Sequence, residues 1–168
     1  RAGFEGSLVG LTGSQNVSFV ETLDSYDSAL AYAEIGSLEN KTTVYIDIAG
    51  DVAVRSRLHH HLADNAQRTL MVGATHWDQF GKSVDSGAVP GAEPEMFFAP
   101  AQIEKRDVEW GRGVIMRQAY AASMQLLQRL SPLLTIEHHA GADACVELWQ
   151  ALLDNQVSGQ RGVMMTLR

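Results

Sequence analysis

The chain has 168 residues, and its 13 Lys and Arg against 20 Asp and Glu give a formal charge of −7. Such a chain lacks the basic face with which nucleic-acid-binding proteins neutralise phosphates, and its densest basic cluster, Lys105, Arg106 and Arg112, is interrupted by acids. With 45% hydrophobic and 20% charged residues, the composition excludes general disorder and favours one core. No apolar run approaches the roughly 20 residues that a membrane helix needs.

The first part of the chain alternates apolar runs with turns of small residues. The run at 43–48 is β-branched, as in a strand buried on both faces of a sheet, and Asp51 is placed to cap the helix behind it. This repeated pattern predicts an α/β fold with a parallel sheet, whose working edge lies at the C-terminal ends of the strands. The predicted strands with their turns are 7–12 with 13–14, 43–48 with 49–50, and 69–72 with 73–75.

The second part is predicted to be mainly helical. Residues 76–94 are rich in Gly, Ser, Asp and Pro and predict a long loop. Glu95–Ala99 predicts a short strand at a sheet edge, where Pro100 would stop the pairing. The remaining expected elements are helices at 101–110, at 112–130 and from 142, and strands at 133–137 and 162–167.

The three small-residue turns are the candidate ligand-binding positions. Small residues at the ends of parallel strands let a ligand approach the backbone, and the helix N-terminus behind them favours phosphate. Helix-to-strand packing explains any single turn equally well, and no full G-x-G-x-x-G fingerprint occurs, so only the three together predict a nucleotide site. The turn at 12–16 has no acid, so it would accept a phosphate, although Ser14 also fits an ordinary helix cap.

The histidines offer one further candidate. The three histidines at 59–61 cannot converge on one ion, because consecutive helical residues point about 100° apart, and we interpret them as a helix end with positive potential. His138 and His139 face opposite sides of a strand. His76 directly follows the third turn and is the candidate proton donor, although an ordinary loop histidine explains it as well.

The chain has a single cysteine, Cys145. It cannot form an internal disulfide or a cysteine-rich zinc site, so we expect reducing, cytoplasmic surroundings and no bound metal. Cys145 shares a helical stripe with Leu148, Trp149 and Leu152, which we expect in the core.

Four parts of the chain carry a resemblance to a known family. They are Ser7–Ser14 with Phe19–Leu23, Tyr45–Gly50 with its D-x-x-G ending, Leu70–Ala74, and the closing helix, turn and strand at Leu152–Met165. In this order they resemble the nucleotide domain of medium-chain dehydrogenases/reductases of the quinone-oxidoreductase type. More narrowly, Val72–Trp77 and Phe97–Pro100 are similar to an uncharacterised branch of that superfamily.

The resemblance implies a Rossmann-like sheet that binds NADPH for the zinc-independent reduction of a small carbonyl, enone or quinone substrate. It also implies a homodimer joined by edge strands, for which Glu95–Ala99 is the candidate. The residues implied at the cofactor are Thr12, Gly13, Ser14 and Asn16 at the 2′-phosphate, Ala49 and Gly50 at its middle, and Gly73, Ala74 and Thr75 around the nicotinamide.

One departure from the family is large, because the catalytic domain and the first strand of the nucleotide domain have no counterpart here. In the strand order 3-2-1-4-5-6 the first strand is central, so its loss is expected to split the sheet. Either the chain is a fragment of a longer protein or the strand comes from elsewhere. Since the chain begins at Arg1 rather than Met, we expect a missing N-terminal segment of the same protein to supply that strand. Residues 1–99 then form the nucleotide-binding portion, and 100–168 the C-terminal helices and closing strands. The alternative is a non-catalytic Rossmann-like nucleotide-binding or assembly module.

Overall fold

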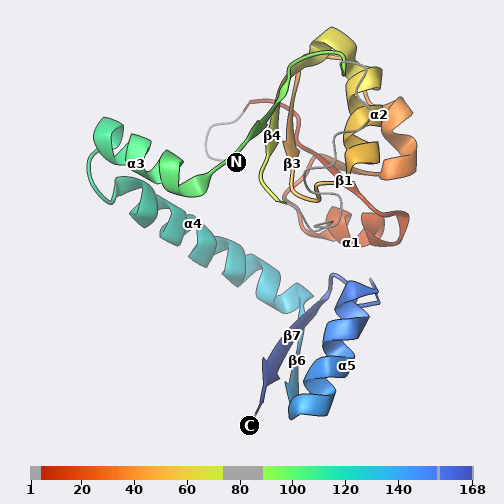
Figure 1. Cartoon of the computed structure of the whole chain (residues 1–168), viewed down its shortest axis with the longest axis vertical. Helices are drawn as coiled ribbons and strands as arrows, with labels where there is room; N and C mark the ends of the chain where they lie inside the picture. The colour runs from red at the N-terminus through yellow and green to blue at the C-terminus, as the bar shows by residue number, and fades with distance from the viewer. Residues whose placement is uncertain (1–4, 74–88, 155, 168) are drawn as a thin grey trace. The chain divides into compact units, whose positions relative to one another are not determined.

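A computed structural model describes residues 5–73, 89–154 and 156–167. The fold is α/β, with three small sheets in the described segments. All strand pairs in the second and third of these sheets, counted along the chain, are parallel, in agreement with the expected Rossmann-like class (Figure 1). The elements are β1 (Val9–Thr12), α1 (Val17–Thr22), β2 (Ser28–Ala31), β3 (Thr43–Asp47), α2 (Val52–Leu62), β4 (Ala66–Met71), β5 (Pro94–Met96), α3 (Ala99–Trp110), α4 (Val114–Leu130), β6 (Thr135–Ala140), α5 (Ala142–Leu153) and β7 (Arg161–Thr166), with short 3₁₀ helices at Ser14–Asn16, Tyr32–Ser37, Ala63–Asn65 and Ser131–Leu133.

The contacts within the chain divide it into two units. One unit is continuous and spans Leu30–Val114, whereas the other joins Arg1–Ala29 to Ile115–Arg168. In the second unit, Arg129 of α4 donates hydrogen bonds to the carbonyl oxygens of Leu23 and Asp24. The expected division at residue 99 is a different one, because it separates two portions of a single domain. It stays a prediction.

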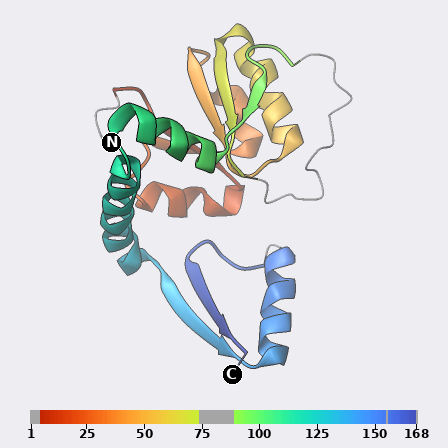
Figure 2. The same cartoon turned by 60° about the vertical axis from the view of Figure 1, so that its left-hand side comes forward.

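The continuous unit is built on the parallel sheet β3-β4-β5, in which Tyr45 pairs with Thr69 and Leu70 with Glu95. Helix α2 runs along one face of this sheet (Figure 2). Its buried residues Val54, Leu58 and Leu62 follow helical spacing and form the centre of the core. Burial of three aliphatic side chains of this size contributes roughly 5–9 kcal/mol of hydrophobic free energy before entropy is subtracted.

The sheet is split where the sequence predicts it. Strands β1 and β2 form a separate two-stranded sheet, and β3 is the outer strand of the three-stranded one. Among the described residues, β3 has a strand partner on one side only. Val44 and Ile46 lie 58% and 52% exposed on it, although such β-branched side chains are typical of an interior strand.

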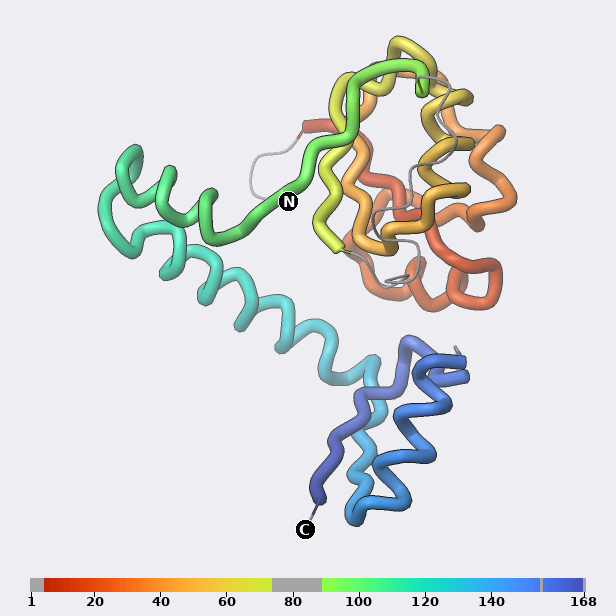
Figure 3. Tube along the Cα trace, viewed as in Figure 1, coloured from red at the N-terminus to blue at the C-terminus, as the bar shows by residue number. Residues whose placement is uncertain are grey.

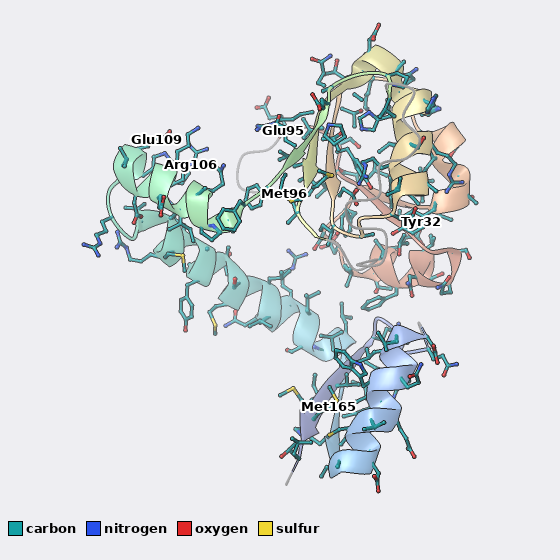
Figure 4. All side chains as sticks on the ribbon, viewed as in Figure 1. Tyr32, Glu95, Met96, Arg106, Glu109 and Met165 are labelled. Carbon is teal, nitrogen blue, oxygen red and sulfur yellow. The ribbon has the colours of Figure 1, made fainter. Side chains whose placement is uncertain are left out.

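The segment around β5 differs in detail from the prediction. The strand covers Pro94–Met96 rather than Glu95–Ala99, and helix α3 already begins at Ala99. Pro100 therefore lies in the first turn of a helix, where its missing N–H costs nothing, and does not end a strand. On α3, Lys105 and Arg106 of the basic cluster both pair with Glu109, and Figure 4 labels Arg106 and Glu109.

Helix α4 carries an apolar surface that the described residues do not cover. None of its side chains is buried, and Tyr120 and Leu127 are 70% and 56% exposed. Arg117 and Arg129 are its only charged residues. No helix of the described segments is both long and apolar enough to cross a membrane.

At the C-terminal end, α5 connects the parallel strands β6 and β7 and packs beside them (Figure 3). The expected core stripe of α5 is only partly correct. Leu148 is buried, but Trp149 and Leu152 are exposed and Cys145 is half-buried. Because the sheet β6-β7 has only two strands among the described residues, it covers a narrow part of the α5 surface. Of the four residues of the stripe, it therefore encloses only Leu148.

The three consecutive histidines of α2 point to three different partners. His59 is fully buried, with Nδ1 2.8 Å from the carbonyl oxygen of Pro90 and Nε2 2.9 Å from the hydroxyl of Thr69. His60 bonds to its own helix at Ser56, and His61 to Leu38. Because the carbonyl of Pro90 can only accept, Nδ1 of His59 donates to it, and the Thr69 hydroxyl is the partner of Nε2.

Replacing His59 tests the importance of this buried bridge. His59→Leu leaves the Thr69 hydroxyl and the Pro90 carbonyl without their partner, so we expect it to lower the free energy of unfolding by about 2 kcal/mol. His60→Leu is the control on the same helix, because that side chain is exposed, and we expect a change within about 0.5 kcal/mol. Urea denaturation of both variants measures the difference; equal effects would show that the bridge contributes nothing.

A second prediction concerns Glu137, which accepts two hydrogen bonds from Arg161 across β6 and β7. These bonds, and a weaker one with His139, lower the pKa of Glu137 from its ordinary 4.5 to about 2. A lowered folded-state pKa stabilises the fold fully above pH about 4.5, and this stabilisation is lost as the pH falls towards 2. We expect Glu137→Gln to remove that pH dependence in acid denaturation followed by circular dichroism. An unchanged acid limb in the variant would contradict the assignment.

Candidate functional site

The C-terminal end of β3 is organised by Asp47, whose side chain is 1% exposed. Its Oδ1 accepts a 2.8 Å hydrogen bond from the amide of Gly50, and its Oδ2 accepts a 2.8 Å bond from Nη1 of Arg55 on α2. Its backbone carbonyl accepts from the amides of Val72 and Gly73 beyond β4. One residue thus holds the turn after β3, the first turns of α2 and the turn after β4.

Two tyrosines lie close to this carboxylate. Burial raises the pKa of Tyr45, and the negative charge of Asp47 together with a hydrogen bond between them raises it further. Tyr32, beside the first turn of α2 in Figure 4, has its pKa raised by burial and then by Asp51 and Asp47. Both phenols therefore keep their protons at neutral pH, and neither can act as a base there.

The N-terminus of α2 already holds a carboxylate. Oδ1 of Asp51 accepts hydrogen bonds from the amides of Ala53 and Val54, as predicted for the cap. Because this carboxylate occupies the amide groups that an anion would use, a phosphate group does not fit there. The end of β3 therefore suits an uncharged part of a ligand.

The turns after β3 and β4 touch each other through their backbones. A Cβ atom on Gly73 would lie 2.2 Å from the carbonyl oxygen of Ile48, so only glycine permits this approach. Gly50 has φ of +71°, a conformation that glycine adopts without strain. Of the predicted residues, the structure thus brings Ala49 and Gly50 together with Gly73. Ala74, Thr75 and His76 lie outside the described residues.

The remaining predicted residues form the turn after β1, in the other unit. Gly13 precedes the 3₁₀ helix Ser14–Asn16, and neither Gly13 nor Asn16 caps a helix with a side-chain hydrogen bond. Ser14 is exposed, whereas Thr12, Gly13 and Asn16 are half-buried. Ser14 is therefore not the N-cap that the sequence allowed. Helix α1 has only 6 residues, so its dipole adds little to anion binding.

This turn retains the chemistry of a phosphate-binding loop without a strong helix behind it. It offers the Ser14 hydroxyl and the Asn16 amide, with no acid in the first turn of either helix. The donor set fits a 2′-phosphate, since these groups can donate hydrogen bonds to it and no described carboxylate lies within the turn.

Sequence reasoning missed the side chains that organise the site, namely Tyr32, Tyr45, Asp47 and Arg55. One signal was available, because an acid at the end of a β-branched run is costly to bury unless it is paired. Arg55, eight residues later, is the base that pairs with it. In the described segments, no group of three His, Cys, Asp or Glu residues is placed to hold a metal ion, so the expected absence of zinc stays a prediction.

Among the comparisons with known proteins, a match was found to a protein family. No curated protein and no solved structure matches the chain. A family profile described as "Protein of unknown function (DUF2855)" matches residues 2–158, which is nearly the whole sequence. The chain therefore belongs to the DUF2855 family.

Proposed function

We propose that this chain is the cofactor-binding portion of a cytoplasmic, zinc-independent reductase that uses NADPH to reduce a small carbonyl, enone or quinone substrate. The observation that carries the proposal is the contact between the turns after β3 and β4, where Gly73 lies against the backbone of Ile48, two residues before Gly50, at the C-terminal ends of adjacent parallel strands. Ligands of open α/β sheets bind at such strand ends. The acid-free turn after β1 supports NADPH as the cofactor.

The residues have separate tasks in this proposal. Thr12, Ser14 and Asn16 bind the 2′-phosphate, while the turn at Gly50 approaches the middle of the cofactor at an uncharged ribose rather than at the charged pyrophosphate, and the turn at Gly73 approaches the nicotinamide. The bound cofactor supplies the hydride, and the protein orients it and excludes water. Asp47 acts as a positioning residue because it holds both turns. His76 remains the candidate proton donor.

The free edge of β3 supports a further part of the proposal. Because β3 has a strand partner on one side only among the described residues, we propose that a further strand, supplied by an N-terminal segment of the same protein, pairs there. Val44 and Ile46 would then be covered as in an interior strand, and the unpaired backbone groups of β3 would gain partners. Tests of cofactor binding therefore need the complete protein.

Cofactor preference tests the site directly. Hydrogen bonds to a charged phosphate contribute about 1–3 kcal/mol, so we expect NADPH to bind roughly tenfold or more tightly than NADH. Ser14→Asp should invert that order, because a carboxylate repels phosphate and accepts a hydrogen bond from a free ribose hydroxyl. Fluorescence titration of both nucleotides measures the two preferences.

The control for this titration is Ser18→Asp, an exposed site on α1 outside the turn, which should keep the preference for NADPH. Equal affinities in the unmodified protein, or an unchanged order in Ser14→Asp, would remove the assignment of this turn. Binding of neither nucleotide would favour the non-catalytic assembly module instead.

We also propose a homodimer joined at β5, the outer strand opposite β3. Met96 and Phe98 are 54% and 63% exposed beside this edge, which supports an apolar contact. Phe98→Lys should convert the dimer into monomer in multi-angle light scattering, because two copies would bring like charges together. Val108→Lys, 88% exposed on α3, is the control and should leave the dimer intact. A dimer that survives Phe98→Lys would exclude this interface.

A further inference from the structure

Helix α5 and strand β7 border an apolar groove of about 390 Å³ that has no role in the proposed reaction. The α5 residues in it follow the spacing of one helix face. No residue of β6 lines the groove, so it lies on the β7 side of the strand pair, where Figure 4 labels Met165. The lining residues are Ala142, Cys145, Val146 and Trp149 of α5, with Met165, Thr166 and Leu167 at the end of β7.

Strand β7 is open along the same side. Among the described residues it pairs with β6 alone. The carbonyl oxygens of Gln160 and Thr166 accept hydrogen bonds from the β6 side. Because backbone groups alternate along a strand, Val163 and Met165 direct their N–H and C=O groups to the opposite edge. Such an edge is a template for one more strand.

The charged residues that α5 carries beside the groove are all acidic. Helix α5 carries the acids Asp143 and Glu147, and no Lys or Arg occurs from residue 140 to residue 154. Both acids are exposed and follow directly after the groove residues Ala142 and Val146. An occupant with a basic side chain next to its apolar one would complement this border.

We propose that β7 and α5 bind an extended peptide segment, which adds as a strand to the free edge of β7, inserts an apolar side chain into the groove and places a Lys or Arg against Asp143 and Glu147. A helix or a small apolar molecule could fill the groove but would leave the backbone groups of Val163 and Met165 unpaired. An extended strand with an apolar side chain both fills the groove and pairs the backbone groups of Val163 and Met165. The backbone hydrogen bonds along β7 then supply affinity, and the groove supplies specificity.

A labelled peptide tests this proposal on the full chain. The probe is a short fluorescein peptide of alternating Thr and Val with one central Phe flanked by Lys, titrated by fluorescence anisotropy. We expect saturable binding in the micromolar range, roughly 10–100 μM. A peptide with the same side chains but N-methylated at alternate amides cannot complete the ladder and should bind at least about tenfold more weakly.

Two exposed positions on α5 give matched variants. Val146 lines the groove and is 68% exposed, whereas Leu153 is 55% exposed and does not line it. Val146→Lys should weaken binding at least about tenfold through bulk and like charge, and Leu153→Lys by less than about twofold. Neither side chain is in the core, so circular dichroism should show both variants folded.

Several results would overturn the proposal. They are the absence of saturable binding, equal binding of the N-methylated peptide, and equal weakening by the two lysine variants. Self-association of the chain that Val146→Lys abolishes would assign the groove to a second copy instead and would equally exclude the peptide. None of these outcomes depends on the nucleotide, so they leave the proposed reductase untouched.

Discussion

The buried carboxylate of Asp47 is the interaction on which the continuous unit depends. An ionised carboxyl group with 1% exposure is tolerated only when its oxygens are matched by donors, and here the amide of Gly50 and the guanidinium of Arg55 match them. Three parts of the chain are fixed by this one side chain and its carbonyl: the turn after β3, the start of α2 and the turn after β4. The close approach of Gly73 to Ile48 is possible because those turns are held in place.

Local patterns in the sequence predict the elements well where packing and local preference agree. The β-branched run at 43–48, the cap at Asp51 and the helical spacing of Val54, Leu58 and Leu62 all lead to the observed strand, helix and core. The prediction fails at Pro100 because a proline fits both a strand end and the first turn of a helix. The prediction of a core stripe fails for most of α5, because hydrophobic spacing identifies which face of a helix is apolar but not how much of that face the sheet covers.

The candidate site was harder to predict because its parts come from different segments. Small residues at strand ends mark the turns, and these positions follow from the sequence. The pairing of Asp47 with Arg55 depends on how α2 lies on the sheet, which no local pattern specifies. Asp51 illustrates the same limit, since the sequence identifies it as a cap, while only the structure shows the hydrogen bonds by which its carboxylate occupies the amides of Ala53 and Val54 and so disfavours phosphate there.

The discontinuous unit has a consequence for biosynthesis. Residues 5–29 meet Arg129 and the neighbourhood of Gly159 through contacts such as those of Leu23, Asp24 and Phe19, across more than a hundred positions of chain. Ribosomes add roughly 5–20 residues each second, so this segment waits several seconds for its partners. The unit from Leu30 to Val114 has most of its contacts within itself and is complete before α4 has left the ribosome. The middle of the chain is therefore expected to fold first, and the two ends to close around each other afterwards.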